Sequence, residues 1–312
     1  MPRVAVVGNL LMDLVLGPLA RFPAFGQELL VSERSMRSAG QAFNSAVALA
    51  ALGDVPSLIG AVGNDDLGAR ILVDLRAGAV ATDLVTVDGL RPTGLTVALL
   101  NEDRDRAFVT HLGHLDAFGV ETVFARWAEV AESRYLLFCG YGNLPAMRPT
   151  GGLALLERAR TEGVITVLDT GWDPDDWQSG GREEVWAMLR ATDIFLPNLE
   201  EARALTGLED AVEAARQLSA AGPDTIMIKL GPEGALGYRQ GELIRVPATS
   251  TVVQDTVGAG DAFNAGVLYA LIREWSLTDA LSLGTAVAGY TIAGHEPRHP
   301  TIAQALALQH RV

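Results

Sequence analysis

The chain has 312 residues, and its 24 Lys and Arg against 38 Asp and Glu give a formal net charge of −14. With 49% apolar and 20% charged residues, the composition is that of a globular protein with a large core, which excludes general disorder. The acidic balance argues against nucleic acid or an anionic membrane as the main partner. The single cysteine, Cys139, excludes an internal disulfide framework and is typical of a reducing compartment, so we expect a cytoplasmic protein.

Along most of the chain, short apolar runs alternate with longer segments of helical period, which is typical of parallel β-α-β units. The runs are apolar on both faces, as expected for a sheet covered by helices on both sides. We expect strands at Val4–Val7, Ser57–Val62, Tyr135–Phe138, Thr166–Leu168, Ile194–Leu196 and Thr225–Lys229. The predicted helices between them are Phe43–Leu52, Leu67–Ala77, Thr122–Glu132, Leu153–Glu162, Glu184–Arg190 and Val212–Ala221.

Two segments depart from this rhythm. Gln27–Ser38 and Leu95–His111 alternate apolar and polar residues, the pattern of half-exposed antiparallel strands, and the second has a charged turn at Asn101–Arg106. We therefore expect one domain over residues 1–312, with the strands of a small separate sheet inserted at about residues 9–38 and 91–112. Two apolar helices, Gly260–Ile272 and Thr278–Ala293, are predicted near the C-terminus.

The segment Asp255–Phe263, of sequence DTVGAGDAF, carries the strongest chemical signal. Gly258, Ala259 and Gly260 precede a helix that begins at about Asp261. Amide N–H groups at a helix start lack intrahelical partners and lie at the positive end of the helix dipole, so they favour a phosphate or a developing oxyanion. A plain glycine loop with an acid in the first helical turn explains Asp261, but not a second acid at Asp255 beside a hydroxyl.

Two common nucleotide-binding motifs are missing from the sequence. Gly258-x-Gly260 lacks the third glycine of the dinucleotide-binding fingerprint, and no β-α-β unit follows it. No G-x-x-x-x-G-K-[ST] run occurs either. A Rossmann oxidoreductase and a P-loop phosphotransferase are therefore disfavoured.

Other short motifs occur along the chain in a recognisable order. They are Gly8-Asn9 with Asp13 beyond it, AGQAFN at 39–44, GAVGNDDLG at 60–68, PTG at 92–94, PNLEE at 197–201 and KLGPEG at 229–234. With the 255–263 segment, this ordered set resembles the PfkB/ribokinase family of carbohydrate kinases, which transfer the γ-phosphate of ATP to a hydroxyl. The resemblance implies a three-layer α/β/α sandwich with a mostly parallel central sheet, and a small β-sheet lid that excludes water from the sugar site.

The resemblance also implies a role for each matching residue. Asp261 is expected to be the catalytic base, with the amides of Gly258, Ala259 and Gly260 as the anion hole. Asn198 and Glu201 match the motif that holds Mg²⁺, although the same spacing also fits a helix capping box. Asn198, Lys229, Gly231, Gly234, Asp255 and Thr256 are predicted to bind the nucleotide, and Asp13, Gly40, Gln41 and Asn44 to bind the acceptor. Without the resemblance, the sequence at Lys229 also fits a solvated lysine at a strand end, and the sequence at Asp13 fits an ordinary turn residue.

The sequence departs from the family pattern at four places. Ala39-Gly40 replaces a pair of glycines, and Gln41 stands where ribokinase has a lysine, which weighs against ribose as the substrate. Asp169 is followed by Thr170-Gly171 instead of Pro-Asn, so a possible phosphate or metal contact is lost. Arg298 stands where members activated by monovalent cations have a small residue, which argues against a K⁺ site.

The expected function is ATP- and Mg²⁺-dependent phosphorylation of a hydroxymethyl group on a sugar or sugar-like molecule. The alternatives are a nucleoside kinase of the same family and a non-catalytic nucleotide- or sugar-binding module. The intact Asp261, Asn198 and Glu201 count against the binding module. An apolar outer face of the lid, assigned to Leu29, Val31, Val97 and Leu99, predicts a homodimer joined through the lid, against a monomer in which that face closes over the substrate.

Overall fold

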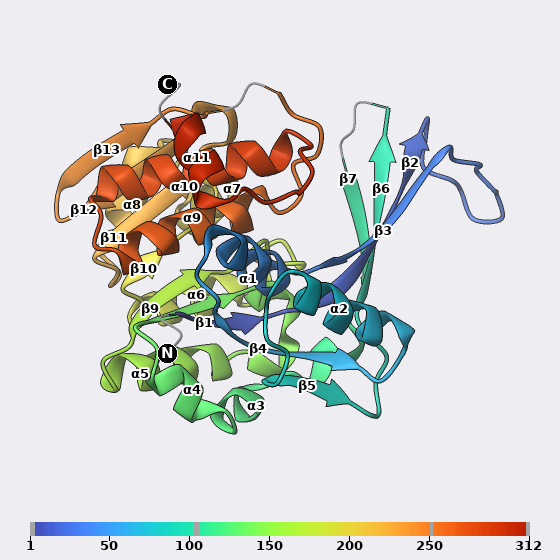
Figure 1. Ribbon diagram of the computed structural model, residues 1–312, viewed down its shortest axis with the longest axis horizontal. Coiled ribbons are helices and arrows are strands. Elements are labelled where there is room, and N and C mark those ends of the chain that lie inside the picture. The colour runs from blue at the N-terminus through green and yellow to red at the C-terminus, as the bar shows by residue number, and fades with distance from the viewer. Residues whose placement is uncertain (1–3, 103–105, 250–251, 310–312) are drawn as a thin grey trace.

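Buried apolar runs form a large central sheet (Figure 1). In the computed structural model, which describes residues 4–102, 106–249 and 252–309, this sheet has the strand order β13-β12-β11-β10-β9-β8-β1-β4-β5. Neighbours from β5 to β11 are parallel, and β12 and β13 add an antiparallel hairpin at one edge. The strands are β1 (Val4–Gly8), β4 (Ser57–Gly63), β5 (Val85–Asp88), β8 (Tyr135–Cys139), β9 (Ile165–Asp169), β10 (Ile194–Phe195), β11 (Thr225–Lys229), β12 (Ala235–Arg239) and β13 (Glu242–Val246).

Helices cover both faces of this sheet. Side chains alternate across a strand, so Val4 and Val6 of β1 belong to one apolar core and Ala5 and Val7 to a second core on the opposite face. The first core is completed by α1 (Gln41–Leu52), α2 (Asp66–Ala77), α9 (Ala259–Ile272), α10 (Leu277–Ile292) and α11 (Ile302–Gln309). The second is completed by α3 (Val120–Phe124), α4 (Trp127–Ala131), α5 (Gly151–Thr161), α6 (Gly181–Leu189), α7 (Leu199–Thr206) and α8 (Ala211–Ser219). The predicted three-layer sandwich is confirmed.

A four-stranded lid stands off the main sheet, and it projects to the right in Figure 1. Its order is β3-β2-β6-β7, so β3 and β7 are its edges. One row of paired residues, Arg37–Asp13–Thr96–Thr110, crosses the lid on its inner face. The next row, Met36–Leu14–Val97–Val109, is apolar and crosses the outer face. The lid strands are β2 (Leu11–Leu19), β3 (Glu33–Ala39), β6 (Leu95–Asn101) and β7 (Arg106–His111).

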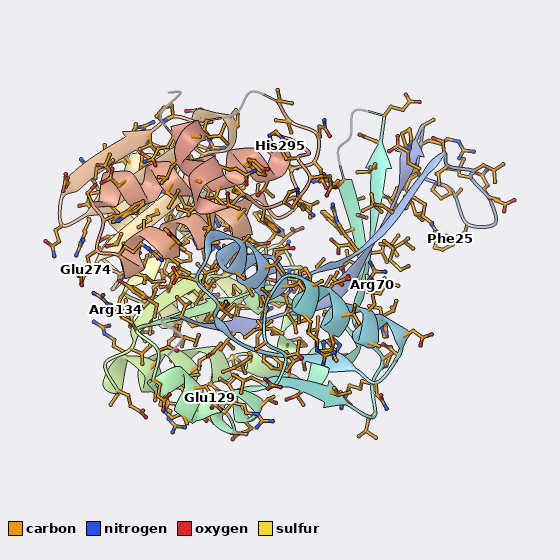
Figure 2. The ribbon with its side chains drawn as sticks, in the orientation of Figure 1. Phe25, Arg70, Glu129, Arg134, Glu274 and His295 are labelled. Atoms are coloured by element: carbon orange, nitrogen blue, oxygen red, sulfur yellow. The ribbon has the colours of Figure 1, made fainter. Side chains whose placement is uncertain are left out.

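The first part of the lid differs from the prediction. The expected strand Gln27–Ser38 is wrong over its first half, because residues 20–32 form a loop and β3 begins at Glu33. Phe25 on this loop is fully exposed (Figure 2), and Leu29 and Val31 also lie there rather than on the lid face. The lid strand that the sequence did not reveal is β2. Its nearly continuous apolar run resembles an extension of the first core strand.

Two smaller differences concern half-exposed or short elements. The predicted helix Thr122–Glu132 is instead two short helices. α3 ends at its C-cap Ala125, and α4 begins after its N-cap Arg126. The edge strands β5 and β13, and β12 next to β13, were not predicted. Of the predicted lid turn at Asn101–Arg106, residues 103–105 lie outside the described residues. Among the described helices, none combines the length and the apolar character that crossing a membrane requires.

Candidate active site

A cavity of about 1420 Å³ lies between the carboxyl ends of the parallel strands and the inner face of the lid. This edge of an open α/β sheet is where ligands generally bind. The lid contributes Asp13, Thr96 and Thr110, and the strand ends contribute Asp169 and Lys229. The cavity brings together every predicted site residue except Asp255, namely Asp13, Gly40, Gln41, Asn44, Asn198, Glu201, Lys229, Gly231, Gly234, Thr256, Gly258, Ala259, Gly260 and Asp261.

Asp261 lies in the first turn of α9, where its side chain is only 6% exposed. Asn44 on α1 donates from Nδ2 to Asp261 Oδ2 over 2.8 Å. Gly258 is the N-cap of α9 with φ 73°, a left-handed conformation that favours glycine. Burial and the charge of Asp169 raise the pKa of Asp261 to about 7, although the Asn44 hydrogen bond and the Lys229 charge oppose this shift. Asp261 therefore titrates near neutral pH at the start of α9.

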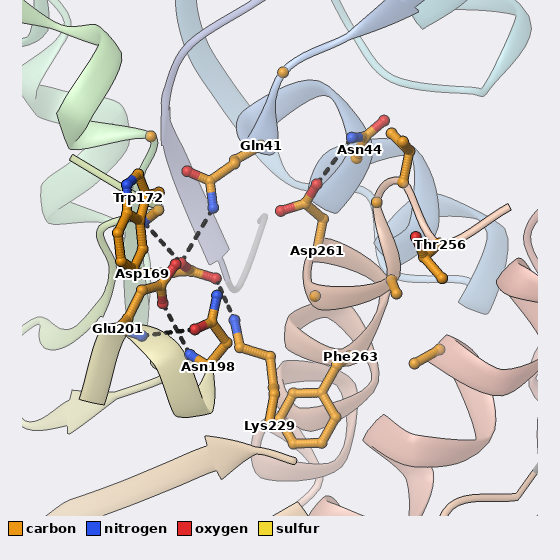
Figure 3. A pocket seen from close by; sticks show the side chains of 18 of the residues that line it. Gln41, Asn44, Asp169, Trp172, Asn198, Glu201, Lys229, Thr256, Asp261 and Phe263 are labelled. Carbon is orange, nitrogen blue, oxygen red and sulfur yellow. Dashed lines mark hydrogen bonds and ion pairs between the residues drawn. The ribbon is translucent and has the colours of Figure 1, made fainter. Parts of the chain in front are cut away.

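Asp169, at the end of β9, is the centre of the polar network in the cavity (Figure 3). Its carboxylate accepts hydrogen bonds from Lys229 Nζ at 2.7 Å, Asn264 Nδ2 at 2.5 Å and Gln41 Nε2 at 3.1 Å. Burial acts to raise its pKa, but the charge and hydrogen bond of Lys229, with the hydrogen bonds from Asn264 and the Gly171 N–H, together hold the pKa below its usual value. Lys229, 14% exposed, is thus a buried ion-pair partner and not a solvated strand-end lysine.

Asn198 and Glu201 form a complete capping box at the start of α7. Asn198 Oδ1 accepts from the Glu201 N–H, and Glu201 Oε2 accepts from the Asn198 N–H, both at 2.8 Å. Such a box satisfies two backbone donors that the helix cannot. Burial and the charge of Asp169 raise the pKa of Glu201 to about 7. The capping interpretation is therefore correct as structure, and the metal role stays a prediction.

The donor set at this strand end is compatible with a magnesium ion. Mg²⁺ takes oxygen ligands, often one or two carboxylates with waters and phosphate oxygens. Glu201 and Asn198 line the cavity close enough to Asp169 for its charge to act on Glu201. Within the described residues no group of three or more His, Cys, Asp and Glu side chains forms a metal cluster by itself. The residues thus fit an ion that phosphate groups share, rather than a closed protein site.

The residues predicted to bind the acceptor lie on β2 of the lid and at the start of α1. Gly40 has φ 105° and precedes α1, and Asn9 Oδ1 accepts from the Gln41 N–H at 2.9 Å. Burial raises the pKa of Asp13 to about 6, against the lowering effect of the Arg37 and Arg298 charges. Asp13 is therefore a buried carboxylate on the lid and not an ordinary turn residue.

Several polar residues around the site were not predicted as site residues. Asn264 follows Asp261 by three positions on α9 and so shares its face, which is a signal that the sequence offered. Arg37 and Arg106 are lid arginines that bind Asp255, and their pairing across 149 positions or more could not be seen in the sequence. Arg298 donates to the Val257 carbonyl and lies 3.8 Å from Asp255.

Comparisons with known proteins agree with this geometry. The pfkB family carbohydrate kinase model matches residues 1–304. The chain is 28% identical over 295 residues to a ribokinase of Haemophilus influenzae, covering 93% of this chain and 92% of the relative. It is 25% identical over 275 residues to a 5-dehydro-2-deoxygluconokinase of Geobacillus kaustophilus, covering 85% and 82%.

Solved structures share the fold. A ribokinase of Arabidopsis thaliana, complexed with ribose and ATP, superposes with a TM-score of 0.84 at 24% identity, over 99% of this chain and 98% of that one. A fructokinase of Xylella fastidiosa with bound ATP gives a TM-score of 0.83 at 22% identity, over 100% and 99%. The family match over nearly the whole length, on a fold with a cavity in the expected place, shows that the chain belongs to the pfkB family of carbohydrate kinases.

Proposed function

We propose that the chain transfers the γ-phosphoryl group of ATP to a hydroxymethyl group of a sugar or sugar-like molecule, with Asp261 as the general base. One observation carries this proposal. The Asp261 carboxyl is buried in the cavity, is oriented by Asn44, titrates at about pH 7, and lies in the same helical turn as the amides of Ala259 and Gly260. A base of that pKa is matched to proton abstraction at neutral pH.

In the proposed reaction, Asp261 accepts the proton of the acceptor hydroxyl. The hydroxyl oxygen then forms its bond to the γ-phosphorus, and the bond from that phosphorus to the bridging oxygen of the leaving ADP breaks. The amides of Gly258, Ala259 and Gly260 hold the negative charge on the transferred group, where positioning and electrostatics supply most of the rate.

The nucleotide side of the cavity is assigned to the strand ends. Lys229 Nζ lies close to the start of α9, since a Cβ built on Gly260 would be 3.3 Å from it. That position suits a contact with a phosphate. Asn198 and Glu201 would hold Mg²⁺, which neutralises phosphate charge and polarises the phosphorus-oxygen bonds when bound.

The acceptor side is assigned to Asp13, Gly40, Gln41 and Asn44. Carboxylate and amide groups are suited to hydrogen-bond sugar hydroxyls. The curated relatives are named as ribokinases and 5-dehydro-2-deoxygluconokinases, which favours a sugar over the nucleoside alternative. The family match likewise favours an enzyme over a binding module. Gln41, in place of the lysine of ribokinase, weighs against ribose itself.

We also propose that two copies of the chain join through the outer face of the lid. The row Met36–Leu14–Val97–Val109 is apolar across all four strands, and Met36 and Val109 are 48% and 58% exposed in the single chain. An apolar row of this kind on a thin sheet favours burial against a second copy.

The experiment that tests the kinase assignment is an ADP-release screen. Purified protein is incubated with Mg²⁺ and ATP and with hexoses, pentoses, ketohexonates, polyols and nucleosides in turn. Turnover on a sugar or sugar acid that exceeds the rate without acceptor supports the proposal. Turnover on nucleosides alone would establish the alternative acceptor class.

A further inference from the structure

Both edges of the lid converge on one carboxylate of the main body. Arg37 on β3 donates from Nη1 to Asp255 Oδ2, and Arg106 on β7 donates from Nη2 to Asp255 Oδ1 at 2.6 Å. Because β3 and β7 are the two outer strands of the lid, the lid meets Asp255 from both sides. These are contacts between segments far apart in the chain, and they exist only while the lid lies against the body.

The same carboxylate organises the residues that lead into α9. Asp255 Oδ1 accepts from the Val257 N–H at 3.0 Å, and Arg106 Nη1 donates to Thr256 Oγ1 at 2.7 Å. The residue after Val257 is Gly258, the N-cap of α9. Each of the three residues before the proposed anion hole is thus held by an interaction that involves Asp255 or Arg106.

Helix α9 itself offers little freedom to adjust. Every residue from Asp261 to Ala270 is buried, and the helix packs between α1 and α10. A change in the position of the first amides relative to Asp261 therefore falls to the segment 255–258, whose backbone is also held by the Ile292 carbonyl, which accepts from the Asp255 N–H at 3.3 Å, and by Arg298, which donates to the Val257 carbonyl. Whatever orders this segment decides whether the anion hole is assembled.

The ion pairs of Asp255 with Arg37 and Arg106 are sufficiently buried to hold the 255–258 segment in place. Isolated exposed ion pairs contribute little, but this carboxylate is 33% exposed and its partners Arg37 and Arg106 are 25% and 19% exposed. Burial acts to raise the pKa of Asp255, but the hydrogen bonds from Arg37 and the Val257 N–H with the arginine charges hold it below its usual value. The carboxylate is consequently ionised and paired at neutral pH.

We propose that Asp255 is a positioning residue that couples lid closure to assembly of the anion hole: Arg37 and Arg106 fix its carboxylate when the lid closes, and the carboxylate then fixes the 255–258 segment. This proposal rests on the proposed function, since the segment matters for rate only if Gly258, Ala259 and Gly260 bind the transferred phosphoryl group. It assigns Asp255 to the lid, whereas the sequence predicted a nucleotide contact.

Hydrogen exchange on the full-length protein without ligands tests the coupling directly. The variants are Asp255→Asn and the double variant Arg37→Gln/Arg106→Gln. The matched control is Arg34→Gln, which removes the same charge from β3 but on the opposite face of the strand. We expect amides in a peptide spanning 252–263 to exchange about tenfold faster in both test variants, since each loses charge-assisted hydrogen bonds, and to be unchanged in the control. Unchanged exchange in the test variants overturns the proposal.

Kinetics separate positioning from nucleotide contact. With the acceptor that the ADP-release screen selects, kcat should fall about 10- to 100-fold in Asp255→Asn, with little change in KM for ATP. Adding Arg37→Gln to Asp255→Asn should cause no further loss, because the hydrogen bond of Arg37 to the segment is made to Asp255 itself, and Arg106→Lys should retain part of the rate. Strictly additive losses, or a raised KM for ATP with normal kcat, contradict the proposal. Thermal melting checks that each variant is folded. If no acceptor is phosphorylated, the proposed function fails, and the exchange experiment still decides the coupling.

Discussion

Asp261 and Glu201 are two buried carboxyl groups whose pKa values both lie at about 7, next to the ion pair of Asp169 and Lys229 (Figure 3). Asp169 keeps its charge because Lys229 faces it directly. The two other acids then feel both burial and the negative charge of Asp169, and both effects raise their pKa values toward neutral pH. Perturbed pKa values of this kind concentrate at functional sites.

Replacing Asp261 tests the proposed base. Asp261→Asn keeps the size and a hydrogen bond with Asn44 but cannot accept a proton, so kcat should fall by about two to four powers of ten. ATP should still raise the melting temperature of the variant as it does for the wild type. A kcat near the wild-type value would remove Asp261 from the role of base.

The pH dependence of kcat/KM for the acceptor should report the same group. The pKa of Asp261 is raised to about 7, so the active carboxylate is lost as the pH falls through that value. We expect an acidic limb centred at about pH 7 and a fall of about tenfold per unit well below it. Lys229→Met should move this limb to higher pH, because the Lys229 charge lowers the pKa of Asp261. A profile that stays flat down to about pH 5 contradicts the assignment.

The sequence predicted these residues better than their contacts. Asp261, Asn44 and Lys229 were found through motifs, and they do line one cavity. The motif could not show that Asp169 would join Lys229, Asn264 and Gln41, since those contacts span up to 128 positions. Nor could it show that Asp255 pairs with Arg37 and Arg106 of the lid. Charge partners across a fold are set by topology, which a local pattern does not contain.

At the scale of elements, the start of α7 has a structural role as a capping box and a proposed chemical role as the Mg²⁺ site. The Asn198 and Glu201 side chains complete the helix end, and the same Glu201 lies buried within reach of the Asp169 charge. Capping by a neutral glutamine is as good as by glutamate in this motif. The two roles are therefore separable by one substitution.

Glu201→Gln should keep the cap and lose the charge. We expect the Mg²⁺ concentration for half-maximal activity to rise severalfold, with the melting temperature and KM for the acceptor little changed. The matched control is Glu200→Gln, on the neighbouring residue, whose side chain is 67% exposed and pairs with Arg203 at 2.9 Å. An unaltered Mg²⁺ dependence in Glu201→Gln would leave only the capping role.

Element prediction succeeded where both faces of a strand are buried and failed at edges. β1, β4, β8, β9 and β11 were recognised because their apolar runs are short and bounded by helices. β2 was missed because its residues on both faces are partly buried, by the cavity side and by α2, so no alternation is visible. The β12–β13 hairpin turns at Gln240-Gly241, both with positive φ, which is a turn signal the sequence did carry.

At the scale of the molecule, the proposed dimer is assigned to the outer lid row. Val97→Asp introduces a charge into the middle of Met36–Leu14–Val97–Val109 and should convert the proposed dimer to a monomer in light scattering at micromolar concentration. The control is Leu243→Asp, which introduces the same charge at an exposed apolar residue of β13. This strand is the outermost strand of the main sheet and does not belong to the lid.

Two outcomes would contradict the lid-mediated dimer. A wild-type chain that is already monomeric at that concentration removes the interface altogether. A dimer that survives Val97→Asp, with the Leu243→Asp control behaving like wild type, moves the interface elsewhere on the molecule. Neither result bears on the chemistry of Asp261.

The lid is contributed by residues 11–39 and 95–111, whereas the segment and helix that carry Asp261 lie near the opposite end of the chain. The proposed acceptor contact Asp13 and the proposed base Asp261 are thus encoded in different stretches of the gene. Mutations can accumulate in the first without disturbing the second, provided that Arg37 and Arg106 are kept. A chimera that receives the two lid segments of a relative together with the adjoining residues 40–44, which carry Gly40, Gln41 and Asn44, is accordingly expected to inherit that relative's preferred sugar while Asp261 and its helix stay unchanged.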